Sequence, residues 1–191
     1  MDAPLLALTR RSPHLPQGPS EDTAASDNMR QLAQLRWIAV AGQTATILVV
    51  HFGLGTRLPW IEMLGVAGGL ALVNAAILAA LPRHRVRRVE IMLALLLDMG
   101  SLTLQLYFSG GATNPFISLY LLQVVLGAIL LPPGATAVLV AAAGASYALL
   151  GVLYRPLALP TGLVAESADL FAVGRWVAFA MVATLLVLFI A

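Results

Sequence analysis

Six long apolar segments, separated by short polar connections, constrain this chain more than any other feature of its sequence. A helix needs about 20 apolar residues to cross a bilayer, within a range of roughly 17–25. Five of the segments fit that range, but the fourth has 16 residues and reaches only about 24 Å at 1.5 Å per residue. The sequence therefore predicts an all-α, polytopic membrane protein with six transmembrane helices, at residues 37–54, 59–81, 91–108, 116–131, 135–154 and 171–191.

Composition agrees with a bilayer as solvent and excludes several kinds of chemistry. The 191 residues are 60% hydrophobic and 10% charged, whereas soluble domains carry about 25% charged residues. There is no cysteine, which excludes disulfides and thiolate ligands, and the three histidines lie far apart, so no metal site is expected. The arginine cluster "RHRVRR" is flanked by apolar segments, which disfavours a nucleic-acid partner, and no nucleotide-binding or nucleophile motif is present.

The distribution of arginine predicts the orientation in the membrane. If the N-terminus is cytoplasmic, eight arginines lie on the inner side and three on the outer side, in accordance with the positive-inside rule. Six spans then return the C-terminus to the cytoplasm, and the chain is expected to continue there beyond Ala191. Residues 1–28 lack apolar periodicity and are predicted to be a disordered cytoplasmic tail, followed by a six-helix membrane domain over residues 29–191.

A carboxylate and an amide lie inside two neighbouring predicted spans. Asp98 and Asn74 are each seven residues from the inner ends of neighbouring antiparallel spans, so they are expected at the same depth. An ionisable residue at that depth is a candidate for proton movement or signal relay. The alternative is structural: the two side chains hydrogen-bond across the helix pair, with Asp98 protonated.

The loop "SGGATNPF", residues 109–116, is the second candidate site. Gly110 and Gly111 allow close approach to the main chain, Thr113 and Asn114 supply a hydroxyl and an amide, and Pro115 restricts the residue before it. Phe116 adds an apolar face. These groups suit a neutral planar ligand such as a quinone, yet composition alone favours a tight connector.

Three further residues are expected near this loop by their depth in the membrane. Tyr107 and Tyr120 flank it in the sequence, and His51 lies near the outer end of the first span. A histidine there could exchange protons with a quinol, although an interfacial role with the polar tip among headgroups is the more common one.

The heptapeptide "GGATNPF" resembles the GGxxNPF motif of the RegB/PrrB/ActS family of redox-sensing histidine kinases, and "LRWIAVAGQ" (residues 35–43) resembles that family's entry to the first span. The resemblance covers about residues 28–191. It implies a sensor domain of the bacterial inner membrane that binds ubiquinone at Gly110, Gly111, Asn114, Pro115 and Phe116. Thr113 occupies a variable position of the motif, and Thr113, Tyr107, Tyr120 and His51 are candidates for supporting roles on their positions in the sequence alone.

The resemblance also implies a homodimer that relays the redox state of the quinone pool to a cytoplasmic kinase core and its response regulator. The family's phosphorylated histidine and ATP-binding domain have no counterpart in these residues, so the chain alone is not expected to be an active kinase. A small membrane transporter and a non-sensing membrane anchor that dimerises a kinase are the alternatives.

Overall fold

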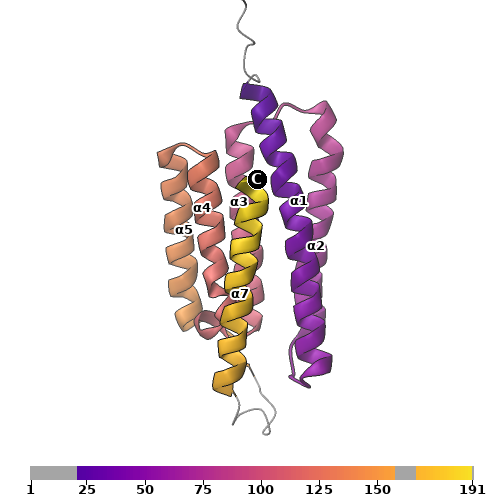
Figure 1. Cartoon of the computed structure of the whole chain (residues 1–191), viewed down its shortest axis with the longest axis vertical. Helices are drawn as coiled ribbons and strands as arrows, with labels where there is room; N and C mark the ends of the chain where they lie inside the picture. Colours follow the sequence, from indigo (N-terminus) through magenta and orange to yellow (C-terminus); the bar gives the residue numbers. More distant parts are fainter. Residues whose placement is uncertain (1–20, 158–166, 191) are drawn as a thin grey trace, which may run out of the picture.

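The computed structural model describes residues 21–157 and 167–190, and the regular structure within these residues is helical throughout. The α-helices run alternately up and down a single bundle (Figure 1) and are α1 (Glu21–Leu48), α2 (Trp60–Ala80), α3 (Arg88–Phe108), α4 (Leu119–Leu130), α5 (Pro133–Val152) and α7 (Ser167–Ile190). The predicted all-α class is therefore confirmed for the described residues.

Five helical segments of the described chain are long and apolar enough to cross a membrane: Ala24–Gly53, Trp60–Arg83, Arg88–Phe108, Pro133–Val152 and Phe171–Ile190. The fourth predicted span corresponds to the shorter apolar helix Pro115–Leu130. Its first four residues form the 3₁₀ turn η4 (Pro115–Ser118), which leaves only 12 residues of α-helix in α4. The structure thus agrees with the sequence that this segment is the short one.

The first helix begins earlier than the sequence suggested. Residues 21–28, which were assigned to a disordered tail, form the start of α1, and the apolar segment begins at Ala24 rather than at residue 37. Residues 1–20 lie outside the described part. The predicted first span began at residue 37 because Arg36 was counted as a flanking charge, whereas α1 carries Arg36 into the bundle, where it is paired with Asp98.

Glycines and prolines set the other helix boundaries. After α1, the π-helical turn η1 (Val49–Gly53) is followed by Gly55, whose φ of 64° is left-handed, and Pro59 then caps α2. Pro82 lies in the 3₁₀ turn η2 (Leu81–Arg83), and Pro133 is the first residue of α5. Proline lacks the N–H that a helix interior needs but fits its first turn, so these breaks are local sequence effects.

Helix α3 forms the centre of the bundle. It packs against α1, α2, α4 and α5. Its buried residues recur every three or four positions, which places them on one broad face of the helix; they include Ile91, Leu95, Met99, Leu102 and Leu106. Helix α7 contacts α1, α4 and η4, so it is held both by helices and by the loop that precedes α4.

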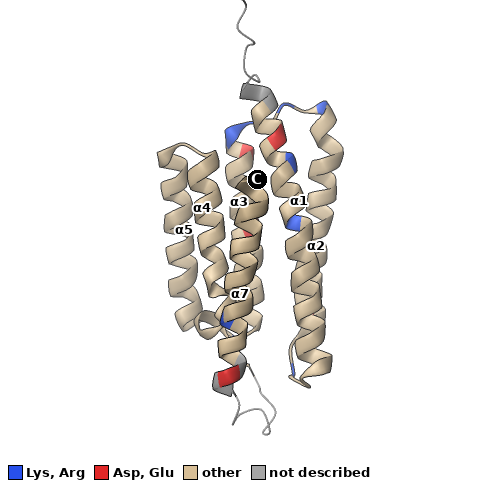
Figure 2. Cartoon of the chain, in the orientation of Figure 1, with Lys and Arg blue, Asp and Glu red and all other residues tan. Residues whose placement is uncertain are grey.

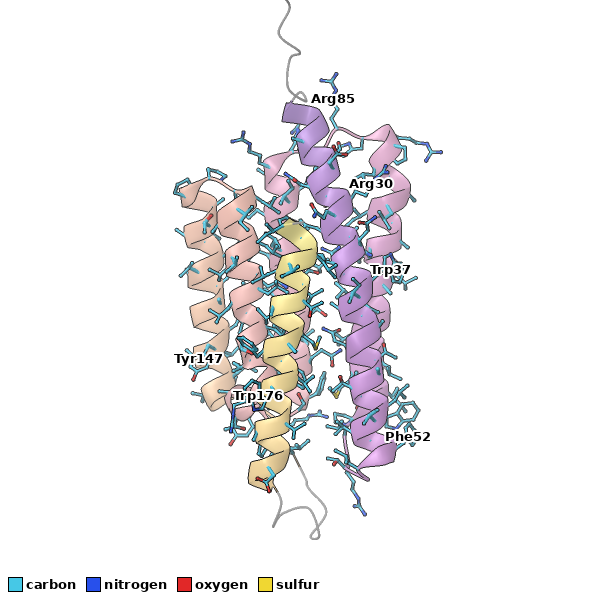
Figure 3. The ribbon with its side chains drawn as sticks, viewed as in Figure 1. Arg30, Trp37, Phe52, Arg85, Tyr147 and Trp176 are labelled. Carbon is cyan, nitrogen blue, oxygen red and sulfur yellow. The ribbon has the colours of Figure 1, made fainter. Side chains whose placement is uncertain are left out.

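Large apolar side chains cover the outside of the bundle, as expected for a protein surrounded by lipid. Figure 3 shows three aromatic residues near the same end, Phe52 on the turn after α1, Tyr147 on α5 and Trp176 on α7, and all three are exposed. Aromatic residues of this kind favour the level of the lipid headgroups.

Charged residues gather at the two ends of the bundle and are sparse between them (Figure 2). We call the end with Arg83, Arg85, Arg87 and Arg88 the arginine end, and the opposite end, with residues 109–118, the loop end. Helix α1 begins and α7 ends on the side of the arginine end (Figure 1). Which end is cytoplasmic remains a prediction from the arginine count.

Candidate functional site

The loop that joins α3 to α4 is built from two consecutive 3₁₀ turns. Helix α3 ends at Phe108, and the turns η3 (Gly111–Thr113) and η4 follow directly. Gly110 and Gly111 have φ values of 106° and 64°, in the left-handed region that favours glycine. The two glycines thus reverse the chain at the loop end within a few residues.

Asn114 holds this loop in shape with both ends of its amide group. Its Nδ2 donates to the carbonyl oxygen of Ser109 at 2.8 Å and lies 2.9 Å from the Ser109 hydroxyl. Its Oδ1 accepts the backbone N–H of Phe116 at 2.9 Å, which caps η4. The amide that the sequence assigned to a ligand is therefore engaged within the loop itself.

Gly111 allows a close approach, as the sequence predicted, but the group that approaches is helix α5 together with the residues just after it. A Cβ on Gly111 would lie 2.5 Å from Cβ of Tyr154 and 2.7 Å from the carbonyl oxygen of Leu150. Both glycines are buried. Thr113 is exposed, and its hydroxyl donates to the carbonyl oxygen of Gly110 at 2.8 Å.

Pro115 connects the loop to the last helix. A Cβ on Gly174 of α7 would lie 2.6 Å from Cγ of Pro115, so the proline ring occupies the space that a side chain there would need. Helix α7 has its closest loop neighbour in η4, which begins with this proline. The heptapeptide thus packs against α5 through Gly111 and against α7 through Pro115.

The aromatic residues expected beside the loop occupy different environments. Phe116 is half-buried and packs against the main apolar core, and Tyr107 is also half-buried and packs there. Tyr120 is buried, and its hydroxyl lies 2.7 Å from that of Thr103. Phe116 and the exposed Thr113 are therefore the better placed of these side chains to meet a ligand from outside the bundle.

His51 belongs to a separate aromatic cluster at the loop end. Its ring centroid lies 4.7 Å from that of Phe52 and 5.8 Å from that of Trp60. Its Nδ1 is shielded and has no hydrogen-bond partner among the described residues. The structure places His51 in η1, and its ring partners lie there and on α2 rather than in the heptapeptide loop.

Asn74 and Asp98 are joined inside the bundle by a third polar residue, Arg36, which the sequence analysis left at the membrane surface. Arg36 of α1 forms an ion pair with Asp98, with Nε 2.5 Å from Oδ1 and Nη2 2.9 Å from Oδ2. Its Nη1 donates to Oδ1 of Asn74 at 3.3 Å, and Asn74 Nδ2 donates to the carbonyl oxygen of Ala33 at 2.9 Å. We refer to Arg36, Asn74 and Asp98 as the buried polar triad.

The triad lies deep in the bundle. Asp98 is ten residues from either end of α3, Arg36 is 3% exposed and Asn74 is fully buried. The predicted proximity of Asp98 and Asn74 is confirmed, because both side chains accept hydrogen bonds from the guanidinium of Arg36. The two side chains were expected to bond directly to each other, but Arg36 lies between them and bonds to both. The sequence could have predicted a partner for Asp98, because an ionised carboxylate in the middle of a membrane span is usually paired with a cationic side chain.

The described residues contain no group of three or more His, Cys, Asp or Glu side chains that could hold a metal ion. They do contain an apolar bundle, a proline-glycine contact that ties a loop to the last helix, and a charge pair inside the bundle. These features define the class of protein: a polytopic helical membrane domain.

Comparison with known proteins identifies the family. The chain is 32% identical, over 151 residues, to the sensor histidine kinase RegB of Cereibacter sphaeroides, and the match covers 78% of this chain. The chain thus belongs to the RegB family of sensor histidine kinases, as a counterpart of the N-terminal part, and is a membrane domain of that family. The match spans 33% of the length of RegB. No family model and no solved structure matches the chain.

Proposed function

We propose that this domain senses the redox state of the quinone pool by binding ubiquinone at the GGATNPF loop, and that it passes the result to a cytoplasmic histidine kinase core. The observation that carries the proposal is the heptapeptide itself, which forms the loop between α3 and α4 at the loop end of a RegB-family membrane domain. The domain would sit in the bacterial inner membrane as a homodimer, with a response regulator as the partner of the kinase core.

The geometry supports different roles for different residues of the motif: some shape the loop, and others are placed to contact a ligand. Gly110, Gly111 and Asn114 shape the loop through backbone conformation and internal hydrogen bonds. The exposed Thr113 and the half-buried Phe116 would contact the quinone head, with the Thr113 hydroxyl beside a carbonyl oxygen and the Phe116 ring against its face. Tyr107 and His51 would have supporting roles, since Tyr107 packs against the main apolar core and His51 packs against the rings of Phe52 and Trp60.

Pro115 offers a route for the signal. A ligand that prefers one arrangement of the loop shifts the populations of two states only by its difference in affinity for them. Because the Pro115 ring packs against the backbone of Gly174, a movement of the loop would displace α7. Helix α7 is the last described helix, and it ends on the side of the arginine end, where the kinase core would follow.

A photoreactive quinone tests the site. The purified domain in lipid nanodiscs is irradiated with an azido-quinone, and the labelled peptide is mapped with and without excess ubiquinone. Label that falls within residues 109–118 and is removed by competition supports the proposal. Label that maps to other helices contradicts it.

Two substitutions sharpen this experiment. Phe116→Leu should weaken quinone binding about tenfold, which corresponds to about 1.4 kcal/mol. Phe179→Leu is the control, because Phe179 is an exposed aromatic on α7 outside residues 109–118. Equal affinities for both variants would remove Phe116 from the site.

A non-sensing anchor remains the second candidate, and one observation favours it: the Asn114 amide is already satisfied within the loop. A chimera of this domain with a kinase core separates the two functions. An anchor would give kinase output that ignores the ubiquinone-to-ubiquinol ratio, whereas a sensor would follow it.

A further inference from the structure

An apolar groove lies at the arginine end of the bundle, between α1, α2 and α3. Its volume is about 260 Å³, which exceeds the roughly 150 Å³ of a cavity that accommodates benzene. Met29, Val86 and Ala94 line the groove and are buried, whereas Ala80 of α2 and Leu93 of α3 line it and are exposed. Because exposed side chains form part of its wall, the groove is open to the surroundings of the bundle.

The wall of this groove selects a hydrocarbon chain. Eight of its ten lining residues are apolar, and the two polar ones, His84 and Glu90, are bonded to each other, with Nε2 2.9 Å from Oε1. The other lining side chains offer no hydrogen bond, so a polar ring would lose its partners there. Along α3 the groove extends over seven residues, from Glu90 to Leu97, which is about 10 Å at 1.5 Å per residue. Its length and its apolar wall suit a segment of an acyl chain.

Positive charge surrounds the same end of the groove. The four arginines that define the arginine end lie within six consecutive residues, and all four are exposed. The same stretch of chain supplies His84 and Val86 to the lining of the groove. Figure 3 shows the side chain of Arg85 directed away from the bundle. Within residues 83–90 the acidic residue is Glu90, which is bonded to His84, so the stretch has a clear excess of positive charge.

Helix α3 adds its N-terminus to this positive region. The helix begins at Arg88, and the side chain of its N-cap residue, Arg87, makes no capping bond. The N-terminal end of a helix carries a partial positive charge that attracts phosphate groups. Arginine clusters beside membrane helices attract the headgroups of anionic lipids. Positive charge at one end and an apolar groove beside it match the two parts of an anionic phospholipid.

We propose that this groove binds one acyl chain of an anionic phospholipid, whose phosphate is held by the arginines beside it. The chain lies against Ala80 of α2 and Leu93 and Leu97 of α3, so the lipid bridges these two helices. The site is at the opposite end of the bundle from the GGATNPF loop, and it does not depend on quinone binding there.

Photoreactive phospholipids test the proposal. The domain is placed in phosphatidylcholine nanodiscs that contain a small fraction of either phosphatidylglycerol or phosphatidylcholine with the same diazirine on its acyl chain, and the labelled residues are mapped by mass spectrometry. Label at Leu93 and Leu97 should be severalfold higher with the phosphatidylglycerol probe. Leu104, an exposed residue of α3 outside the groove, should be labelled equally by both probes. Equal labelling by both probes at Leu93 and Leu97 would overturn the proposal.

Removing positive charge tests how the headgroup is held. Arg83→Gln/Arg87→Gln should lower the phosphatidylglycerol label at Leu93 to the level seen with phosphatidylcholine. Arg57→Gln is the control, because Arg57 is an exposed arginine in the turn between α1 and α2, at the other end of the bundle. An unchanged label at Leu93 in the double variant would contradict binding of the phosphate by the arginines.

Filling the groove tests where the chain lies. Ala79 and Ala80 are both exposed in the last turn of α2, but Ala80 lines the groove and Ala79 does not. Ala80→Phe should reduce the phosphatidylglycerol label at Leu97 severalfold, whereas Ala79→Phe should leave it unchanged. Both positions are on the surface, so neither substitution disturbs the buried core. Equal labelling of Leu97 in the two variants would show that the acyl chain does not occupy the groove.

Discussion

The ring of Pro115 in the loop packs directly against the backbone of Gly174 in the last helix, with no room for a side chain between them. A Cβ on Gly174 would lie 2.6 Å from Cγ and 3.2 Å from Cβ of the proline. Both partners are rigid, since one is a ring and the other is helical backbone. The contact therefore fixes the height of η4 against α7 and makes glycine at position 174 a packing requirement.

Gly174→Ala should consequently destabilise the domain. The added methyl group overlaps the proline ring, and overpacking of this kind costs about 1–3 kcal/mol. The measurement is the thermal unfolding midpoint of the purified domain in detergent. Gly144→Ala on α5 is the control, because a Cβ there meets nothing within 4 Å and alanine favours helix by about 1 kcal/mol over glycine. A Gly174→Ala protein as stable as Gly144→Ala would contradict the contact.

Gly111→Ala and Gly55→Ala separate backbone strain from steric overlap. Both glycines have a φ of 64°, so alanine costs each of them about 1–2 kcal/mol in the left-handed region. At Gly55 a Cβ meets nothing within 4 Å, whereas at Gly111 it would collide with Tyr154 and Leu150. Gly111→Ala should lower the unfolding midpoint clearly more than Gly55→Ala, and equal shifts would mean that α5 does not close over the loop.

Asn114→Asp distinguishes the two roles of the Asn114 side chain. Aspartate keeps an acceptor for the N–H of Phe116 but loses the donor to Ser109. The substitution should retain the cap of η4 and lose part of the loop's rigidity, whereas Asn114→Ala loses both and should cost about 0.5–2 kcal/mol, as for a lost helix cap. Unfolding midpoints should fall in the order wild type, Asn114→Asp, Asn114→Ala. An aspartate variant less stable than the alanine variant would contradict this account of the loop.

The sequence predicted the helices well because apolar length is a local property. Segment ends at Pro59 and Pro82 could be read from the proline positions, and the fourth segment was short in both sequence and structure, whereas α5 begins at Pro133, two residues before the predicted 135. The start of α1 could not be read in this way. Arg36 counts as a charge in any local window, and its partner Asp98 lies 62 residues further along the chain.

The sequence predicted that the loop permits close approach and carries a hydrogen-bonding amide, but it did not predict which groups these residues contact. Gly111 was expected to permit close approach, but a single sequence does not say that the approaching group is Tyr154, 43 residues away, instead of a ligand. Asn114 offers the same donor and acceptor to a quinone and to its own loop. Its bond to Ser109, five residues earlier, depends on the two left-handed glycines between them, and that geometry appears only once the chain is folded.

The absence of cysteine from the sequence makes the orientation directly measurable. Thr113→Cys places a thiol on the exposed side of the loop end, and Gly134→Cys places one at the exposed first turn of α5 on the opposite end, where a Cβ has open space. If the arginine end is cytoplasmic, a membrane-impermeant maleimide should label Thr113→Cys in spheroplasts, whereas Gly134→Cys should react only after lysis. The reverse pattern would invert the predicted topology.

The Arg36–Asp98 pair should show strong coupling in a double-mutant cycle. Arg36→Met leaves Asp98 without its counter-charge, and Asp98→Leu leaves the guanidinium unpaired; breaking a buried pair from one side costs about 3–5 kcal/mol. Because Arg36→Met/Asp98→Leu removes both charges together, the double variant should be more stable than either single variant. Arg36→Lys should not rescue the pair, since the two bonds to Oδ1 and Oδ2 come from separate nitrogens of one planar group.

Unfolding in mixed micelles gives the four free energies, with Arg83→Met at the exposed arginine end as the control for loss of a surface charge. Simple additivity of the two single substitutions would mean that the charges do not depend on each other, and the triad would then have no role in holding α1, α2 and α3 together.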